Sequence, residues 1–155
     1  MRRVRVEGVG VDTFLNTVVV LRDVETPQWL PIWIGHEEAK SIAAQLEGKQ
    51  PVRPLSHDLL RSLIVAIKVK VLGINVHDLQ DNTFFACITL EDDKHKRHDL
   101  DARPSDAIAL AIRVQCPIFV SGAALEAMRT NPQEREDDLD RFQRLVEGVN
   151  LGGDE

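Results

Sequence analysis

The chain has 155 residues and a formal net charge of −6, with 43% hydrophobic and 28% charged residues. This length suits one domain with a substantial hydrophobic core, and the composition is ordinary for a globular protein. No apolar run approaches the roughly 20 residues of a membrane helix, and the basic start lacks the apolar segment of a signal peptide. We therefore expect a cytoplasmic protein that does not span a membrane, with Cys87 and Cys116 reduced and buried.

The negative charge is concentrated near the C-terminus. Residues 131–155 contain eight acids and three arginines, which gives −5, whereas the other 130 residues carry 17 acids against 16 lysines and arginines, which gives −1. We expect a nearly neutral domain over 1–130 and an acidic C-terminal helix and tail over 131–155, with the helix at 134–146. A neutral body neither favours nor excludes a polyanionic partner such as RNA or DNA.

The first third of the chain is predicted to hold three strands and a helix. Residues 3–11 alternate valine with other side chains, and the alternation changes phase at Gly8, which indicates a strand with a bulge. Residues 16–21 are rich in β-branched side chains and predict a strand buried on both faces. Residues 29–34 alternate in the manner of a third strand, and the apolar spacing over 39–46 is that of a helix.

The remainder of the domain follows a similar order. A loop with two prolines over 49–55 precedes an amphipathic helix whose apolar stripe is Leu59, Leu60, Leu63 and Ile64. The almost wholly apolar segment 107–114 predicts a central, buried helix. The other expected elements are strands at 69–76, 83–90 and 118–120, a turn at 81–82, and a short helix at 122–128.

The sequence also repeats itself. Residues 4–11 (VRVEGVGV) and 69–76 (VKVLGINV) both read V-x-V-x-G-[VI]-x-V, and an Asn-Thr pair precedes a strand in each half. The helix starts at Glu38 and Asp106 then correspond, at an offset that grows from 65 (position 4 to 69) to 68 (position 38 to 106). These matches predict an α+β fold of two internally duplicated βββα units, in which mixed or barrel-like strands pack against helices.

Two similar segments precede apolar helices, RPLSHD at 53–58 and RPSD at 103–106. One interpretation is helix capping, because proline suits a first turn, serine accepts a bond from a free amide, and an early aspartate complements the helix dipole. The other interpretation is a binding site, because the amides of a helix start and a nearby arginine can hold a phosphate. The residues alone leave both interpretations open.

Acidic residues near these segments suggest a metal site. Asp99 and Asp101 are two residues apart on an expected strand, so both should project to one face, shortly before Asp106. Together with Asp58 they could converge on a divalent ion that activates water. The alternative is plain surface charge beside the basic residues 94–97.

Several familiar catalytic arrangements are excluded. Ser56, His57 and Asp58 cannot form a catalytic triad, because neighbours on a helix point about 100° apart. The segment 36–40 has lysine where a zinc protease motif needs its second histidine, and the chain has no phosphate-binding GxxxxGK loop.

Three segments, IWIGHEEAKSIAAQLEG, RPLSHDLL and ARPSDAIALA, together resemble the bifunctional nuclease (BFN) domain family in order and spacing. The resemblance covers about residues 4–128. It implies an α+β fold with an internal duplication, commonly a homodimer, in cytosolic bacterial proteins and in plant relatives described as nucleases of both RNA and DNA. The polar positions that are hallmarks of the family are all present here: His36, Glu37, Glu38, Arg53, Pro54, Ser56, His57, Asp58, Arg103, Pro104, Ser105 and Asp106.

The leading hypothesis is a metal-dependent nuclease that hydrolyses phosphodiester bonds of RNA or DNA with Mg²⁺ or Mn²⁺. The assigned residues are His57, Asp58 and Asp106 for catalysis; Arg53, Arg103, Ser56 and Ser105 for phosphate; Asp58, Asp101 and Asp106 for the metal; and His36, Glu37, Glu38 and Asp99 as further candidates. The competing hypothesis is a non-catalytic, dimeric binding or regulatory module that recognises a small anionic ligand or a protein partner.

Overall fold

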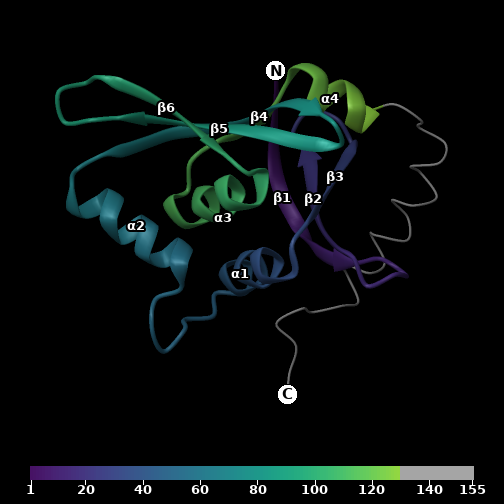
Figure 1. Ribbon diagram of the computed structural model, residues 1–155, viewed down its shortest axis with the longest axis horizontal. Coiled ribbons are helices and arrows are strands. Elements are labelled where there is room, and N and C mark those ends of the chain that lie inside the picture. The colour runs from purple at the N-terminus through teal and green to yellow at the C-terminus, as the bar shows by residue number, and fades with distance from the viewer. Residues whose placement is uncertain (130–155) are drawn as a thin grey trace.

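The computed structural model describes residues 1–129, which form a seven-stranded mixed sheet and four helices (Figure 1). The elements in chain order are β1 (Arg2–Val11), β2 (Thr17–Asp23), β3 (Trp29–Ile34), α1 (His36–Leu46), α2 (Ser56–Ala66), β4 (Lys70–Gln80), β5 (Thr83–Glu91), β6 (Arg97–Ala102), α3 (Pro104–Val114), β7 (Ile118–Val120) and α4 (Gly122–Arg129). The helix expected at 134–146 and the acidic tail lie outside the described residues.

The strands follow the order β3-β2-β1-β7-β4-β5-β6. Two antiparallel groups of three strands therefore flank the short β7, which is antiparallel to β1 and parallel to β4. The sheet is open, with β3 and β6 at its edges, and β1 and β2 run across the direction of β4 and β5 in Figure 1. Such a twisted, mixed sheet with helices confirms the α+β class.

The two halves share local features. Each passes through three strands into one helix, α1 in the first half and α3 in the second. The first strand of each half also changes register at the corresponding glycine, between Val6 and Gly8 in β1 and between Val71 and Gly73 in β4. The bulge expected near Gly8 is thus confirmed. The features of both halves fit a duplication, which itself stays a prediction.

Helix α3 lies at the centre of the core. Its residues 107–111 are all buried, as the apolar sequence predicts, and α1, α2 and α3 gather below β4 and β5 in Figure 1. The predicted burial of β2 on both faces is also confirmed: Val19 belongs to the main core, whereas Val18 and Val20 form a second cluster with Trp29. The core therefore holds the starts of the helices in fixed positions.

Helix α2 departs from expectation. Of the predicted stripe Leu59, Leu60, Leu63 and Ile64, only Ile64 is buried. The helix is turned so that His57 and Ile64 face the rest of the domain, because His57 hydrogen-bonds to α1 and α3. Its leucines consequently point to solvent.

Cys87 and Cys116 are free thiols and half-buried, so the burial expected for them is only partial. Within residues 1–129, no helix has the length and apolar character that crossing a membrane requires.

Candidate functional site

The starts of α1, α2 and α3 lie together and are joined by side-chain hydrogen bonds. Each helix carries an acid at its third position: Glu38 in α1, Asp58 in α2 and Asp106 in α3. An acid is favourable there because the N-terminal end of a helix carries partial positive charge. Local helix chemistry thus places three carboxylates in one region, and tertiary contacts decide what each one does.

His57 connects the three helices. Its Nδ1 atom lies 2.7 Å from Oγ of Ser41 in α1, and its Nε2 atom lies 2.9 Å from Oδ1 of Asp106 in α3. The imidazole side chain is only 12% exposed. We refer to Glu38, Ser41, His57, Arg103 and Asp106 as the Asp106 cluster.

The hydrogen-bond network selects one tautomer of His57. A carboxylate can only accept, so the imidazole hydrogen sits on Nε2 and is donated to Asp106. Nδ1 then accepts the hydrogen of the Ser41 hydroxyl, and Ser41 Oγ in turn accepts from Nη2 of Arg113 at 3.0 Å. A Ser-His-Asp series therefore exists, although not among the sequence neighbours at 56–58. Ser41 is buried and already bonded on both sides, so its hydroxyl is not presented to a substrate.

Arg103 supplies the exposed cation of the cluster. Its Nε donates to Asp106 Oδ2 at 2.9 Å, and its Nη2 lies 2.8 Å from Asp106 Oδ2 and 3.1 Å from Glu38 Oε1. The side chain is 67% exposed, and its remaining terminal nitrogen has no hydrogen bond to any residue of 1–129. One edge of the guanidinium is therefore turned to solvent and open to an anion.

The ionisation of Asp106 follows from these contacts. Burial opposes its negative charge, but hydrogen bonds from His57 and Arg103, together with the charge of Arg103, outweigh burial and lower the pKa of Asp106. The carboxylate is consequently ionised at neutral pH and keeps both neighbours in place.

Asp58 belongs to a different, structural contact. Arg113 of α3, with only 2% of its side chain exposed, donates from Nε to Asp58 Oδ1 at 2.8 Å, from Nη1 to the Ala109 carbonyl and from Nη2 to the Ser41 carbonyl. The other Asp58 oxygen accepts the Leu55 amide at 2.9 Å and closes the start of α2. Burial opposes the charge of Asp58, yet the bonds from Arg113 and Leu55 lower its pKa.

The remaining predicted residues lie outside the Asp106 cluster, either exposed, buried in α3 or on β6. Arg53, Ser56, His36 and Glu37 are exposed and form no hydrogen bond to the Asp106 cluster within residues 1–129, whereas Ser105 is buried in the first turn of α3. The strand β6 exposes Asp99 and Asp101 as predicted; Asp99 accepts a bond from Thr89, and Asp101 pairs in register with Cys87. The structure thus brings together His57, Arg103, Asp106 and Glu38 from the predicted set.

The predicted metal ligands do not meet. Asp58 is bound to Arg113, Asp106 is bound to His57 and Arg103, and Asp101 stands on β6. In the part of the chain that the structure describes, no three His, Cys, Asp or Glu side chains are close enough to hold an ion. As placed, these residues do not fit Mg²⁺ or Mn²⁺, which bind through several converging oxygens.

Sequence reasoning missed two residues of the network, Ser41 and Arg113. Arg113 had a readable signal, because a charged residue inside the apolar segment 107–114 is rarely buried unless it is paired. Ser41 is one polar residue among alanines and an isoleucine on the buried side of α1, which is a weaker signal.

Comparison with known proteins adds a family match. Residues 19–133 match the bifunctional nuclease domain, and this range contains the whole Asp106 cluster. The chain is also 38% identical over 160 residues to two proteins of Mycobacterium tuberculosis, one from strain CDC 1551 / Oshkosh and one from strain ATCC 25618 / H37Rv. Each alignment covers 96% of this chain and 95% of the relative. The relatives' names, uncharacterized protein MT1877 and uncharacterized protein Rv1829, state no activity.

Proposed function

Because the chain belongs to the bifunctional nuclease domain family, we propose that it hydrolyses phosphodiester bonds of RNA and DNA at the Asp106 cluster. The observation that carries the proposal is the hydrogen bond between His57 and Asp106 beside an arginine with one open edge. General acid-base chemistry on a phosphate needs a fixed carboxylate or imidazole and a cation for the phosphoryl oxygens. A cytoplasmic location belongs to the same proposal.

Each side chain has a role in the proposed reaction. Arg103 binds a non-bridging oxygen of the phosphate, and Asp106 orients a water molecule and takes its proton as the water attacks phosphorus. The bond from phosphorus to the leaving oxygen breaks on the side opposite the attack, that oxygen takes a proton from solvent, and Asp106 releases its proton to solvent. His57, fixed by Ser41, donates to Asp106 and keeps its carboxylate in one orientation.

The assay uses the purified full chain with single-stranded RNA and DNA. We expect Asp106→Asn to reduce the cleavage rate by about 100-fold or more, the usual contribution of a positioned acid-base group. The matched control is Glu126→Gln, an exposed acid of α4 that forms no hydrogen bond or ion pair with the cluster within residues 1–129, which should cleave as the unmodified chain does.

The same assay tests the metal requirement. Reactions with Mg²⁺, with Mn²⁺ and with a chelator are compared, for the unmodified chain and for Asp101→Asn. If cleavage is lost both in the chelator and in Asp101→Asn, this would support the predicted metal site. The side chains would then have to rearrange to reach the ion. Equal cleavage by the unmodified chain and Asp106→Asn would contradict the assignment of the site.

A non-catalytic module is the second candidate, and one observation favours it. Both acids at the starts of α2 and α3, Asp58 and Asp106, are already paired with arginines, as in a network that serves only the fold. Absence of cleavage under every metal condition, by a chain that remains folded, would support this function.

A homodimer is part of either function. The outward face of α2 carries Leu59 and Leu63, and the residues that flank the helix, Leu55 and Ile67, continue the same four-residue spacing. Leu59 and Leu63 are 63% and 54% exposed, and contiguous apolar surface of this kind marks protein interfaces. We therefore propose that two copies pair through α2.

The dimer is tested by mass in solution. Leu59→Lys and Leu63→Lys should shift the mass from dimer to monomer, because each places a charge at the centre of the proposed interface. Phe14→Lys, at an exposed apolar residue between β1 and β2, is the matched control and should stay dimeric. A monomeric unmodified chain would remove this part of the proposal.

A further inference from the structure

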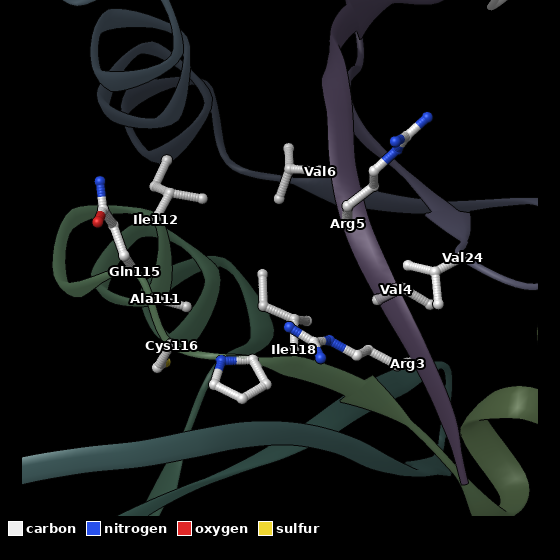
Figure 2. Close-up of a pocket in the computed structure, with 11 residues that line it drawn as sticks. Arg3, Val4, Arg5, Val6, Val24, Ala111, Ile112, Gln115, Cys116 and Ile118 are labelled. Carbon is white, nitrogen blue, oxygen red and sulfur yellow. The ribbon is translucent and has the colours of Figure 1, made fainter.

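Two hollows open at the end of α3 that lies away from the Asp106 cluster. They have volumes of about 520 Å³ and about 500 Å³ and lie on either side of the same segment, 115–117, which lines both. The first, drawn in Figure 2, lies against β1 and β7, and the second lies against α2 and β4. Because they share this segment, the two hollows are neighbours, and we refer to the pair as a trough.

The charged residues that line this trough all have the same sign. The first hollow contains Arg3 and Arg5, the second contains Arg61 and Lys70, and neither contains an acid. The floor is apolar, with Val6 in the first hollow as one example. In a chain of net charge −6, a surface lined only by cations favours an anionic partner.

Most of these cations are not engaged by the protein. Arg5 pairs with Glu7 at 3.4 Å, but Arg3, Arg61 and Lys70 form no ion pair within residues 1–129. Figure 2 shows the Arg3 side chain extending over Ile118, whereas the Arg5 guanidinium points away from the other labelled residues. We name the two hollows with Arg3, Arg61 and Lys70 the cationic trough.

Two helices, α2 and α3, connect the cationic trough with the Asp106 cluster. Arg61 follows His57 by four residues on α2, so both lie on the same face of that helix. Helix α3 joins the two regions as well, with Asp106 near its start and the 115–117 segment after its end. Its 11 residues make it about 16 Å long, a distance that a few nucleotides can span.

We propose that single-stranded nucleic acid binds along the cationic trough and reaches the Asp106 cluster past Arg61; this rests on the proposed function. Two separate apolar hollows can each receive an unstacked base, while the cations contact phosphates. A duplex fits less well because its bases are stacked and paired inside the helix. The trough therefore selects unpaired strands.

The experiment measures binding apart from cleavage. The full chain with Asp106→Asn, in chelator, is titrated into labelled oligouridylate and oligothymidylate of about twelve nucleotides, within the site sizes of single-strand binding domains. Between about 50 and 200 mM salt, three phosphate contacts should give a slope of about −2 in log K against log salt. Arg3→Ala and Arg61→Ala should each weaken binding about tenfold, the value of one charged hydrogen bond, and reduce the slope by about 0.7.

Matched controls come from the hairpin between β5 and β6, which carries the basic residues 94–97. Lys94→Ala and Arg97→Ala remove equally exposed cations and should leave affinity unchanged. Loss of binding in these two variants, with none in Arg3→Ala and Arg61→Ala, overturns the proposal, as does equal affinity for a duplex. A peptide of residues 131–155, of net charge −5, is the competitor; displacement of the oligonucleotide at equal concentration would assign the trough to an acidic segment instead.

The two proposals can fail separately. If Asp106→Asn still cleaves nucleic acid while the trough variants lose affinity, the catalytic assignment is wrong and the trough is right. If Asp106→Asn loses cleavage while the trough variants bind and cleave normally, the trough is wrong and the catalytic assignment is right.

Discussion

The two Arg-Pro segments look alike in sequence and differ in structure. In RPSD the aspartate follows the arginine by three residues, and in RPLSHD it follows by five. Residues three apart at a helix start lie close enough to pair, so Arg103 binds Asp106. Residues five apart do not, so Asp58 binds Arg113 from another helix, and Arg53 is left exposed.

Because of this difference, one aspartate–arginine pair stabilises the fold and the other can contact a ligand. At the start of α2, the arginine partner Arg113 is buried and makes three hydrogen bonds besides the one to Asp58, whereas at the start of α3 the partner Arg103 is exposed with one open edge. The same pair of residue types thus serves packing in one place and presents a cation to solvent in the other. A substitution at the start of α2 should therefore reduce stability more than activity, whereas one at the start of α3 should reduce activity more than stability.

The largest expected effect is on Arg113. Arg113→Met should lower the free energy of unfolding by about 3 kcal/mol, because it leaves Asp58 without its buried cation and removes the side-chain bonds to Ser41 and to the Ala109 carbonyl. Urea unfolding measures the change, with Arg97→Met on the exposed strand β6 as the control, expected within about 0.5 kcal/mol of the unmodified chain. Arg113→Lys should recover only part of the loss, since lysine cannot reproduce the planar fork. Similar stability of all variants would show that the buried network contributes little.

The next largest expected effect is on the free energy of unfolding, and it differs between Asp58 and Asp106. Asp58→Asn should cost about 2 kcal/mol at neutral pH, and Asp106→Asn about 1 kcal/mol, because Arg103 is largely exposed to solvent. Both pKa values are lowered in the folded protein, so the stabilisation is fully present above the ordinary aspartate pKa of about 3.9 and is lost as pH falls below it. Urea unfolding at a series of pH values should show the variants converging with the unmodified chain in acid. A gap that stays constant down to the lowest pH would contradict this assignment.

The sequence predicted the framework better than the site. The strands, the bulge at Gly8 and the central helix follow from short-range patterns that do not depend on distant residues. The contacts of Ser41 could not be predicted this way, because Arg113 is 72 residues away in the chain. The outward turn of α2 has the same cause: apolar spacing indicates an amphipathic helix but not which surface covers its stripe.

The smallest expected effect is at Arg53, and it tests the comparison most directly. Both Arg53 and Arg103 were predicted to hold phosphate, but only Arg103 lies beside Asp106. Arg53→Ala should change the free energy of unfolding by less than about 0.5 kcal/mol, because the side chain is exposed and makes no ion pair within residues 1–129. Its cleavage rate should equal that of the unmodified chain, whereas Arg103→Ala should lose about 100-fold, the usual effect of removing a donor to the transition state. If both variants lost activity equally, the spacing between arginine and aspartate would not be what assigns the two segments their roles, and the substrate would have to contact the start of α2 as well.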